Sequence, residues 1–317
     1  MTQNSALSRR KLGLSLVAMS VAAGILPETT HAASVRTITD CRGRHVVIPA
    51  AQRIACIGGT ITETLYAFGR SQSIIGVDLT STWPEQAQRE KKNLGYMRAI
   101  STEGVLSLRP DLILAMNDSG PAVAMDQLAA SGVPVVFVDA THSPEAIEGR
   151  TRFLAEIVDA KPEGERLCGT ISDQFRSLAL WRAAHPQMRR VLFVMRMTNN
   201  RPMAAGAGTA ADAVIGLAGA INAGAGMQGY KIVDQENLVA LRPDVILTMQ
   251  QGGYAIRNEL LADPGFQLTP AGKNRAIIAM EGERLLGFWP RKPPAALDLA
   301  RRLVTAGRAV RHHPGSR

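Results

Sequence analysis

Long apolar runs are almost absent from this sequence of 317 residues. After residue 33, no stretch of about 18 uninterrupted apolar residues occurs, so that part of the chain is predicted to contain no membrane-spanning helix. Aromatic residues make up only 4% of the chain, and Lys and Arg are scattered rather than clustered, which disfavours nucleic acid as a partner. The formal net charge is nevertheless +9. It favours an anionic small ligand or an acidic partner surface.

Catalytic and nucleotide-binding signatures are also missing. The sequence has no nucleophile elbow and no HExxH motif, and its 6 His residues are dispersed along the chain. Gly206 and Gly208 precede a predicted helix, but the third glycine and the lysine that phosphate-binding loops need are absent. The sequence therefore indicates a binding protein rather than an enzyme.

Cysteine is scarce and carries no metal-site spacing. Cys41, Cys56 and Cys168 form no C-x-x-C pair. A disulfide between Cys41 and Cys56 and a set of buried free thiols are both compatible with the sequence.

The first 33 residues are typical of a cleaved export signal. Arg9-Arg10-Lys11 precedes an apolar run over residues 12–26, and small residues follow at Ala32 and Ala33. We expect cleavage after Ala32 or Ala33 and export to the periplasm of a diderm bacterium, by either the general or the twin-arginine route. No Cys stands at the cleavage site, which disfavours a lipid anchor.

One pattern occurs twice in the chain. Residues 103–114 and 236–247 each read Glu, then Leu-Arg-Pro-Asp, then an apolar run. Each copy predicts a short helix that ends before the Arg-Pro-Asp turn, since the residue before proline avoids the α region, and then a buried strand. The helix dipole explains each acid singly. Equivalent positions for Glu103 and Glu236 suggest two charges presented to a two-fold partner.

Strand and helix signals alternate on both sides of a purely helical segment. A hairpin is expected over 35–49, and Thr60 to Glu63 read as a capping box. We predict an N-terminal α/β lobe over 34–142, a helical connector over 143–188 and a C-terminal α/β lobe over 189–306. Residues 307–317 are expected to be a disordered tail. The connector is predicted to be rigid because it is helical rather than rich in Gly and Ser.

Several short motifs follow one another in a characteristic order between residues 35 and 305. Together they resemble the periplasmic haem-binding proteins of bacterial haem ABC importers. The resemblance implies two Rossmann-like α/β lobes joined by a long helix, with a single b-type haem between them. The motifs are Gly58-Gly59-x-x-Thr62-Glu63, Asp78-x-Thr80-Ser81-x-Trp83-Pro84, Gly95-Tyr96-Met97-Arg98, Glu103 to Asp111, Pro202 to Asp212 and Leu268-Thr269-Pro270-Ala271-Gly272.

The resemblance also implies roles for individual residues. Tyr96 matches the axial tyrosine of the family, and Arg98 matches the arginine beside it. A phenolate oxygen is a hard ligand suited to ferric iron, although a Tyr in a Gly-bounded loop is more commonly a packing or rim residue. Glu103 and Glu236 match the paired glutamates that dock onto the permease dimer.

The sequence departs from its relatives at a second ligand position. Some relatives have a His there, whereas this chain has Met197. A thioether is a poor partner for ferric iron opposite a phenolate, so we expect five-coordinate iron with Met197 against the porphyrin. The remaining predicted haem contacts are propionate-binding Arg196 or Arg201 and the rim residues Trp83 and Tyr254.

These observations predict a periplasmic haem carrier that serves an inner-membrane ABC permease, downstream of an outer-membrane receptor system. A carrier of a ferric siderophore or a corrinoid is the alternative. A periplasmic haem-modifying enzyme is the candidate from another class.

Overall fold

A computed structural model describes residues 36–186, 188–251 and 253–306. The predicted export signal, the predicted tail and the side chain of Tyr254 lie outside the described part. Within that part, no helix is both long and apolar enough to cross a membrane.

The N-terminal lobe, called the N-lobe below, is built on a parallel sheet of five strands in the order β5-β4-β3-β6-β7. Its strands are mostly short and fully buried, as expected for a sheet with helices on its faces. A separate antiparallel hairpin precedes it and confirms the predicted hairpin. The strands are β1 (Arg36–Thr39), β2 (His45–Ile48), β3 (Ile54–Ile57), β4 (Ile74–Val77), β5 (Lys92–Asn93), β6 (Leu112–Met116) and β7 (Val135–Val138).

The C-terminal lobe, called the C-lobe below, is built on a mixed sheet in the order β11-β9-β8-β12-β13, with β10 also paired to β8. Strands β8, β12 and β13 are parallel, whereas β9 and β11 run antiparallel to their neighbours. The strands are β8 (Arg190–Thr198), β9 (Arg201–Ala205), β10 (Ile221–Asn222), β11 (Tyr230–Ile232), β12 (Val245–Met249) and β13 (Ile277–Met280).

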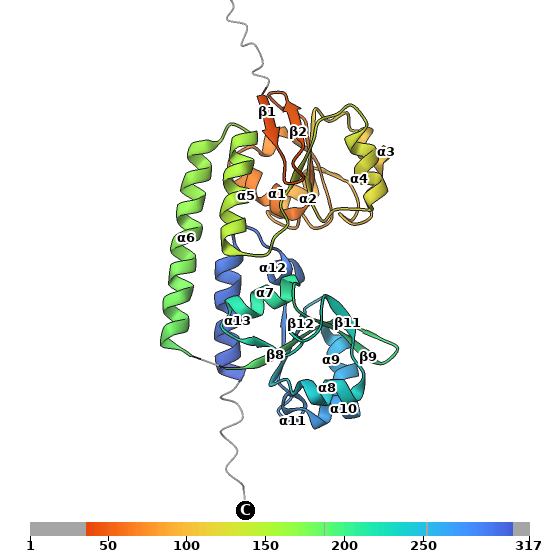
Figure 1. Cartoon of the computed structure of the whole chain (residues 1–317), viewed down its shortest axis with the longest axis vertical. Helices are drawn as coiled ribbons and strands as arrows, with labels where there is room; N and C mark the ends of the chain where they lie inside the picture. Colours follow the sequence, from red (N-terminus) through yellow and green to blue (C-terminus); the bar gives the residue numbers. More distant parts are fainter. Residues whose placement is uncertain (1–35, 187, 252, 307–317) are drawn as a thin grey trace, which may run out of the picture. The chain divides into compact units, whose positions relative to one another are not determined.

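Helices cover both sheets (Figure 1). Those of the N-lobe are α1 (Gly59–Ala67), the 3₁₀ turn η1 (Ser71–Ser73), α2 (Gln86–Glu90), α3 (Thr102–Leu106) and α4 (Ala122–Ala129). Those of the C-lobe are α7 (Ala210–Leu217), α8 (Gln235–Leu241), α9 (Gly253–Ala262), α10 (Pro264–Leu268), α11 (Pro270–Lys273), α12 (Gly282–Leu286) and α13 (Lys292–Ala306).

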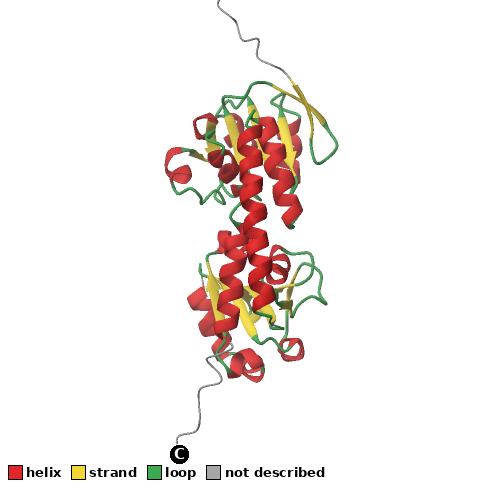
Figure 2. Cartoon of the chain, turned by 90° about the vertical axis from the view of Figure 1, so that its left-hand side faces the viewer, coloured by secondary structure: helices red, strands yellow, loops and turns green. Residues whose placement is uncertain are grey.

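Two helices connect the lobes, α5 (Pro144–Ile157) and α6 (Lys161–Ala184). Pro162 lies in the first turn of α6, where a proline costs no helical hydrogen bond. Helix α6 packs against α5 on the N-lobe side and against α13 on the C-lobe side. In Figure 2 these long helices lie in front of the strands of both lobes. The predicted fold class, two α/β lobes joined by a long helix, is confirmed.

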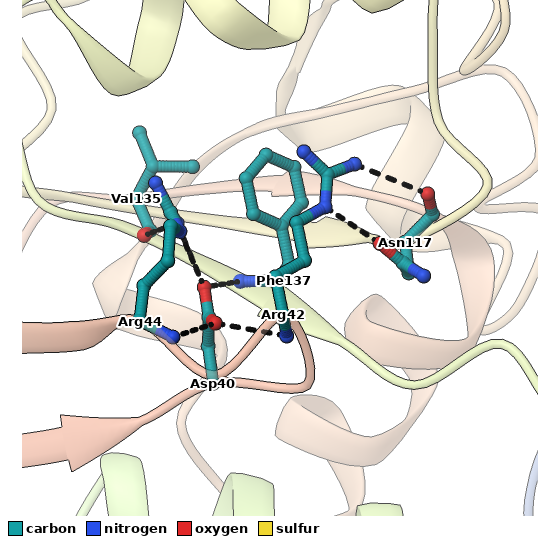
Figure 3. Close-up of polar contacts among 6 residues, drawn as sticks. All are labelled: Asp40, Arg42, Arg44, Asn117, Val135 and Phe137. Atoms are coloured by element: carbon teal, nitrogen blue, oxygen red, sulfur yellow. Dashed lines mark hydrogen bonds and ion pairs between the residues drawn. The ribbon is translucent and has the colours of Figure 1, made fainter.

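A buried aspartate attaches the N-terminal hairpin to the lobe (Figure 3). The carboxylate of Asp40 accepts hydrogen bonds from the guanidinium of Arg44 at 2.7 and 2.9 Å and from backbone amides, including that of Phe137. Burial alone would raise the pKa of Asp40, but these hydrogen bonds outweigh it and hold the pKa below its ordinary value. Arg42 lies over the Phe137 ring and donates to Oδ1 of Asn117 at 2.7 Å. The hairpin is therefore fixed to β7 and to the loop after β6.

The repeated Arg-Pro-Asp turn has the same structure in both lobes. Arg109 and Arg242 both adopt positive φ, at 49° and 45°. Asp111 then accepts hydrogen bonds from the backbone amide of Arg53, just before β3, while Asp244 accepts one from the amide of Arg190, at the start of β8. Each turn thus holds the amino end of the central strand of its own lobe.

The lobes touch through a short segment of the C-lobe, residues 286–292, which precedes and opens α13. Trp289 is buried there and lies close to Gly59 of α1. The guanidinium of Arg291 donates two hydrogen bonds to Glu63 at 2.8 and 3.0 Å. The predicted capping box at Glu63 is therefore wrong: the helix cap is Gly58, without a side-chain hydrogen bond, and the Glu63 side chain serves the contact between lobes.

Two further details differ from or complete the sequence predictions. The three cysteines are free thiols, with Cys41 exposed and Cys56 and Cys168 buried. Residues 190–205 contain a β-hairpin that the sequence did not indicate, because β8 continues to Thr198 and pairs with β9. Its two turn residues, Asn199 and Asn200, both have positive φ, which asparagine tolerates well.

Candidate functional site

A cavity of about 690 Å³ lies between the two lobes. Its N-lobe wall is formed by residues that follow β3, β4, β6 and β7, which is where ligands bind in open α/β sheets. Its C-lobe wall is formed by residues of β8, of the turn before α7, of the start of β11, and of α12 with the loop that follows it. The volume is typical of pockets that enclose a ligand of several hundred daltons.

Tyr96 and Arg98 stand together on the N-lobe wall. Nη1 of Arg98 donates a hydrogen bond to the Tyr96 hydroxyl at 2.9 Å. Nη2 of the same guanidinium pairs with the carboxylate of Asp118, which follows β6, at 2.6 Å. The pKa of Arg98 is raised because these two partners outweigh the cost of its burial. Arg98 is thus held between the Tyr96 hydroxyl and the Asp118 carboxylate.

The rest of this wall is shaped by a buried carboxylate, Asp78, at the end of β4. It accepts hydrogen bonds from the backbone amides of Gly58 and Thr80 at 2.8 and 2.9 Å, and from the hydroxyls of Thr80 and Ser81. Gly58 has a φ of 126°, and a Cβ there would collide with Met116 at 2.3 Å. These contacts explain why the sequence combines two glycines after β3 with Asp-x-Thr-Ser after β4.

A buried cation marks the junction of the lobes. Arg150, on α5, is 3% exposed and donates to the carbonyl of Phe288 in the C-lobe and to the carbonyl of Thr141. Burial lowers its pKa to about 10. The His142 ring lies 4.9 Å from the Phe288 ring, and burial together with nearby cations lowers the pKa of His142. Arg150 also pairs with the carboxylate of Asp139 at 3.7 Å, so this end of the cavity holds a paired cation beside an imidazole that favours its neutral form.

The C-lobe wall carries two ionisable groups of its own, Tyr230 and Glu283. Burial raises the pKa of Tyr230, against the opposing effects of Arg98 and of a hydrogen bond with Thr209. Burial also raises the pKa of Glu283 to about 7, with a contribution from Asp78. Burial therefore favours the neutral form of both groups.

The structure brings only some of the predicted haem contacts to this cavity. Tyr96 and Arg98 line it, with Tyr96 44% exposed. Trp83 is outside the lining and stacks on Arg291, with the guanidinium carbon 4.4 Å from the ring centre. A haem-binding role for Trp83 stays a prediction, as do the roles of the predicted residues in the β8–β9 hairpin.

The hairpin residues lie elsewhere in the C-lobe. Met197 packs against the C-lobe core, and Arg196 donates to Thr198 on its own strand. Arg201 is exposed at the start of β9. None of the three is among the described residues that line the cavity. Tyr254 lies outside the residues whose side chains are described.

Glu103 and Glu236 occupy equivalent places on the two lobes. Each lies in the first turn of a short helix, α3 or α8, whose cap is a side chain, Ser101 or Asp234. Both are exposed, and within the described residues neither forms an ion pair. The two carboxylates are therefore free to meet a partner.

Sequence reasoning missed Asp118, Arg150, Tyr230 and Glu283 as cavity residues. Asp118 follows a buried strand on the carboxyl edge of the sheet, and this position was a usable signal. The other three had none, because α5, β11 and α12 reach the cavity only through the packing of one lobe on the other.

A family comparison agrees with this architecture. Residues 54–283 match the model of the periplasmic binding protein family. The chain belongs to this family, whose members bind a substrate and work with ABC permeases.

Three of the solved structures that are similar to this chain are heme-binding proteins. The periplasmic heme-binding protein BhuT, solved in complex with two hemes, is 39% identical, with a TM-score of 0.77 over 80% of this chain and 98% of that one. The periplasmic heme-binding protein RhuT from Roseiflexus sp. RS-1 is 33% identical, with a TM-score of 0.76 over 81% and 99% of the two chains. A periplasmic heme-binding protein from Pseudomonas aeruginosa is 31% identical, with a TM-score of 0.71 over 78% and 91%.

A curated relative with another ligand also matches. The vitamin B12-binding protein of Yersinia pestis (strain Pestoides F) is 29% identical over 203 residues, which are 62% of this chain and 69% of the relative.

Proposed function

We propose that this protein binds haem b in the cavity between its lobes and delivers it to an inner-membrane ABC permease. The observation that carries the proposal is the pair formed by Tyr96 and Arg98 on the cavity wall. A phenolate held beside a fixed guanidinium is a hard anionic ligand, which suits ferric iron in a porphyrin. The similarity to three heme-binding proteins supports the same ligand.

The cavity fits haem in other respects. Apolar groups, among them Met116, Met195 and Leu286, face the cavity and suit a porphyrin ring. Within the described residues, no three His, Cys, Asp or Glu side chains are grouped to hold a bare metal ion. Iron that arrives within a porphyrin needs only the axial donor that Tyr96 provides.

The wider assignments belong to the same proposal. Residues 1–33 are a signal removed near Ala32 or Ala33 on the way to the periplasm, and an outer-membrane receptor system supplies the haem. The lobes span 34–142 and 189–306, with the connector at 143–188. The protein acts as a carrier and not as an enzyme. Glu103 and Glu236 dock on the permease dimer, one on each half.

A haem titration of the mature protein tests the ligand. Ferric haem is expected to give a phenolate-type absorption spectrum, and its endpoint gives the number of haems per chain. Tyr96→Phe removes the ligand atom but keeps the ring, so the phenolate bands are expected to disappear and the affinity to fall by at least tenfold. An unchanged spectrum in this variant would refute the role of Tyr96.

A corrinoid carrier is the second candidate, because the curated relatives include a vitamin B12-binding protein. Competition separates the two candidates. Cobalamin added in excess is expected to leave bound haem in place. If cobalamin displaces haem at equal concentration, a corrinoid carrier is the better interpretation than a haem carrier.

A further inference from the structure

The cavity contains a second phenol, Tyr230, that the sequence did not indicate. Tyr230 is the first residue of β11, the edge strand of the C-lobe sheet, and pairs with Ala205 of β9. Its ring packs edge-on against Phe193, with 6.5 Å between ring centroids. Strand pairing and ring packing together fix its position on the C-lobe wall.

Tyr230 lines the same cavity as Tyr96. Tyr96 and Arg98 line it from the N-lobe, and Tyr230 lines it from the C-lobe. The hydroxyl of Thr209, at the cap of α7, is within hydrogen-bonding reach of it. Within the described part of the chain, no carboxylate or carbonyl oxygen accepts a hydrogen bond from Tyr230.

The two phenols differ in what surrounds them. Tyr96 is 44% exposed, and its hydroxyl oxygen accepts a hydrogen bond from the guanidinium of Arg98. Tyr230 is more deeply buried, and its raised pKa keeps the proton on the oxygen at neutral pH. The first is suited to coordinate iron, whereas the second is suited to donate a hydrogen bond.

We infer that Tyr230 is a second ligand-contacting residue, whose hydroxyl donates a hydrogen bond to an oxygen atom on the ligand face turned away from Tyr96. The inference rests on the proposed function. In a ferric haem bound through Tyr96, that oxygen belongs to a water or hydroxide that is the sixth iron ligand, so six-coordinate iron replaces the five-coordinate iron expected from the sequence. Tyr230 thereby favours an oxidised, metal-containing porphyrin over one without metal.

The test compares Tyr230→Phe with wild type for two ligands, ferric haem and metal-free protoporphyrin IX. Only haem presents the iron-bound oxygen, so we expect the variant to bind haem about fivefold more weakly and protoporphyrin IX equally well. The spectral transition from bound water to bound hydroxide is expected to move to higher pH, because a donor to hydroxide is lost. Tyr66→Phe is the matched control, since Tyr66 lies on α1 outside the cavity lining.

Three outcomes would overturn the inference. Equal haem affinity with an unmoved transition would show that Tyr230 makes no such contact. Equal losses for both porphyrins would show a packing role only. Loss of the phenolate bands in Tyr230→Phe would make Tyr230 an iron ligand rather than a donor. The proposed function fails separately, if wild type does not bind haem or if Tyr96→Phe leaves its spectrum unchanged.

Discussion

Glu63 and Arg291 form an ion pair that joins the lobes. The Glu63 carboxylate is 5% exposed, and one of its oxygens accepts both hydrogen bonds from Arg291. The other oxygen is buried without a partner. Burial therefore raises the pKa of Glu63 in spite of the neighbouring guanidinium.

Removal of the cation is expected to destabilise the protein. Arg291→Met leaves the Glu63 charge buried and unpaired, which costs about 2–4 kcal/mol of unfolding free energy. Chemical denaturation at pH 8 measures this loss. The double variant with Glu63→Gln should recover part of it, because a neutral amide is cheaper to bury. If the single variant loses less than about 0.5 kcal/mol, the pair is not a stabilising contact.

Asp118 is expected to act on haem through Arg98. Asp118→Ala removes an ion pair in which both side chains are partly exposed, so its effect should be near the upper end for surface pairs, about 1 kcal/mol or fivefold in haem affinity. A titration of each variant with ferric haem measures the effect. Asp126→Ala, an exposed aspartate on α4, should bind haem like wild type. A loss as large as that of Tyr96→Phe would mean that Asp118 touches the ligand directly.

Charge reversal at Glu103 and Glu236 is expected to abolish haem delivery while haem binding stays normal. The reversed charges would repel a cationic docking surface on the permease. Transport into vesicles that contain the permease measures delivery, and absorbance measures binding. Glu145→Lys is a close control, since Glu145 also lies in the first turn of a Ser-capped helix. Intact delivery by the double reversal would refute the docking role.

Glu283 is expected to make stability depend on pH. Its folded pKa of about 7 is above the ordinary carboxyl value of 4.5, so the folded chain holds a proton that the unfolded chain releases. Its contribution is therefore largest below about pH 4.5 and is lost as pH rises through 7. Glu283→Gln should gain stability relative to wild type between pH 5 and pH 8, on the order of 2–3 kcal/mol.

Denaturation of both proteins at the two pH values checks this prediction. The comparison isolates Glu283, since all other titrating groups are shared. An equal difference between the proteins at pH 5 and pH 8 would contradict the raised pKa.

The elements that the sequence predicted well are those with strong local patterns. Buried strands such as β6, the α6 helix and the repeated turn all carry periodicity or proline signals in a short window. The contact between Tyr96 and Arg98 was also predictable, because they share one loop and need no distant partner to meet, whereas their role in haem binding stays a prediction.

The residues whose contacts the sequence did not predict interact with residues far away in the chain. Glu63 lies in a sequence typical of a capping box, yet its side chain turns to a residue more than two hundred positions later. Tyr230 lies in a three-residue edge strand, too short for a periodic signal. Arg150 has no distinguishing sequence pattern, because its partner, the carbonyl of Phe288, comes from the C-lobe.

In each lobe, the repeated turn connects a surface helix to a strand that reaches the cavity. Helices α3 and α8, which present Glu103 and Glu236, each lead into a turn that grips the amino end of β3 or β8. Those two strands lead to cavity-lining residues, Gly58 and Met195. Each surface helix is therefore joined, through one hydrogen-bonded turn and one buried strand, to a residue that lines the cavity.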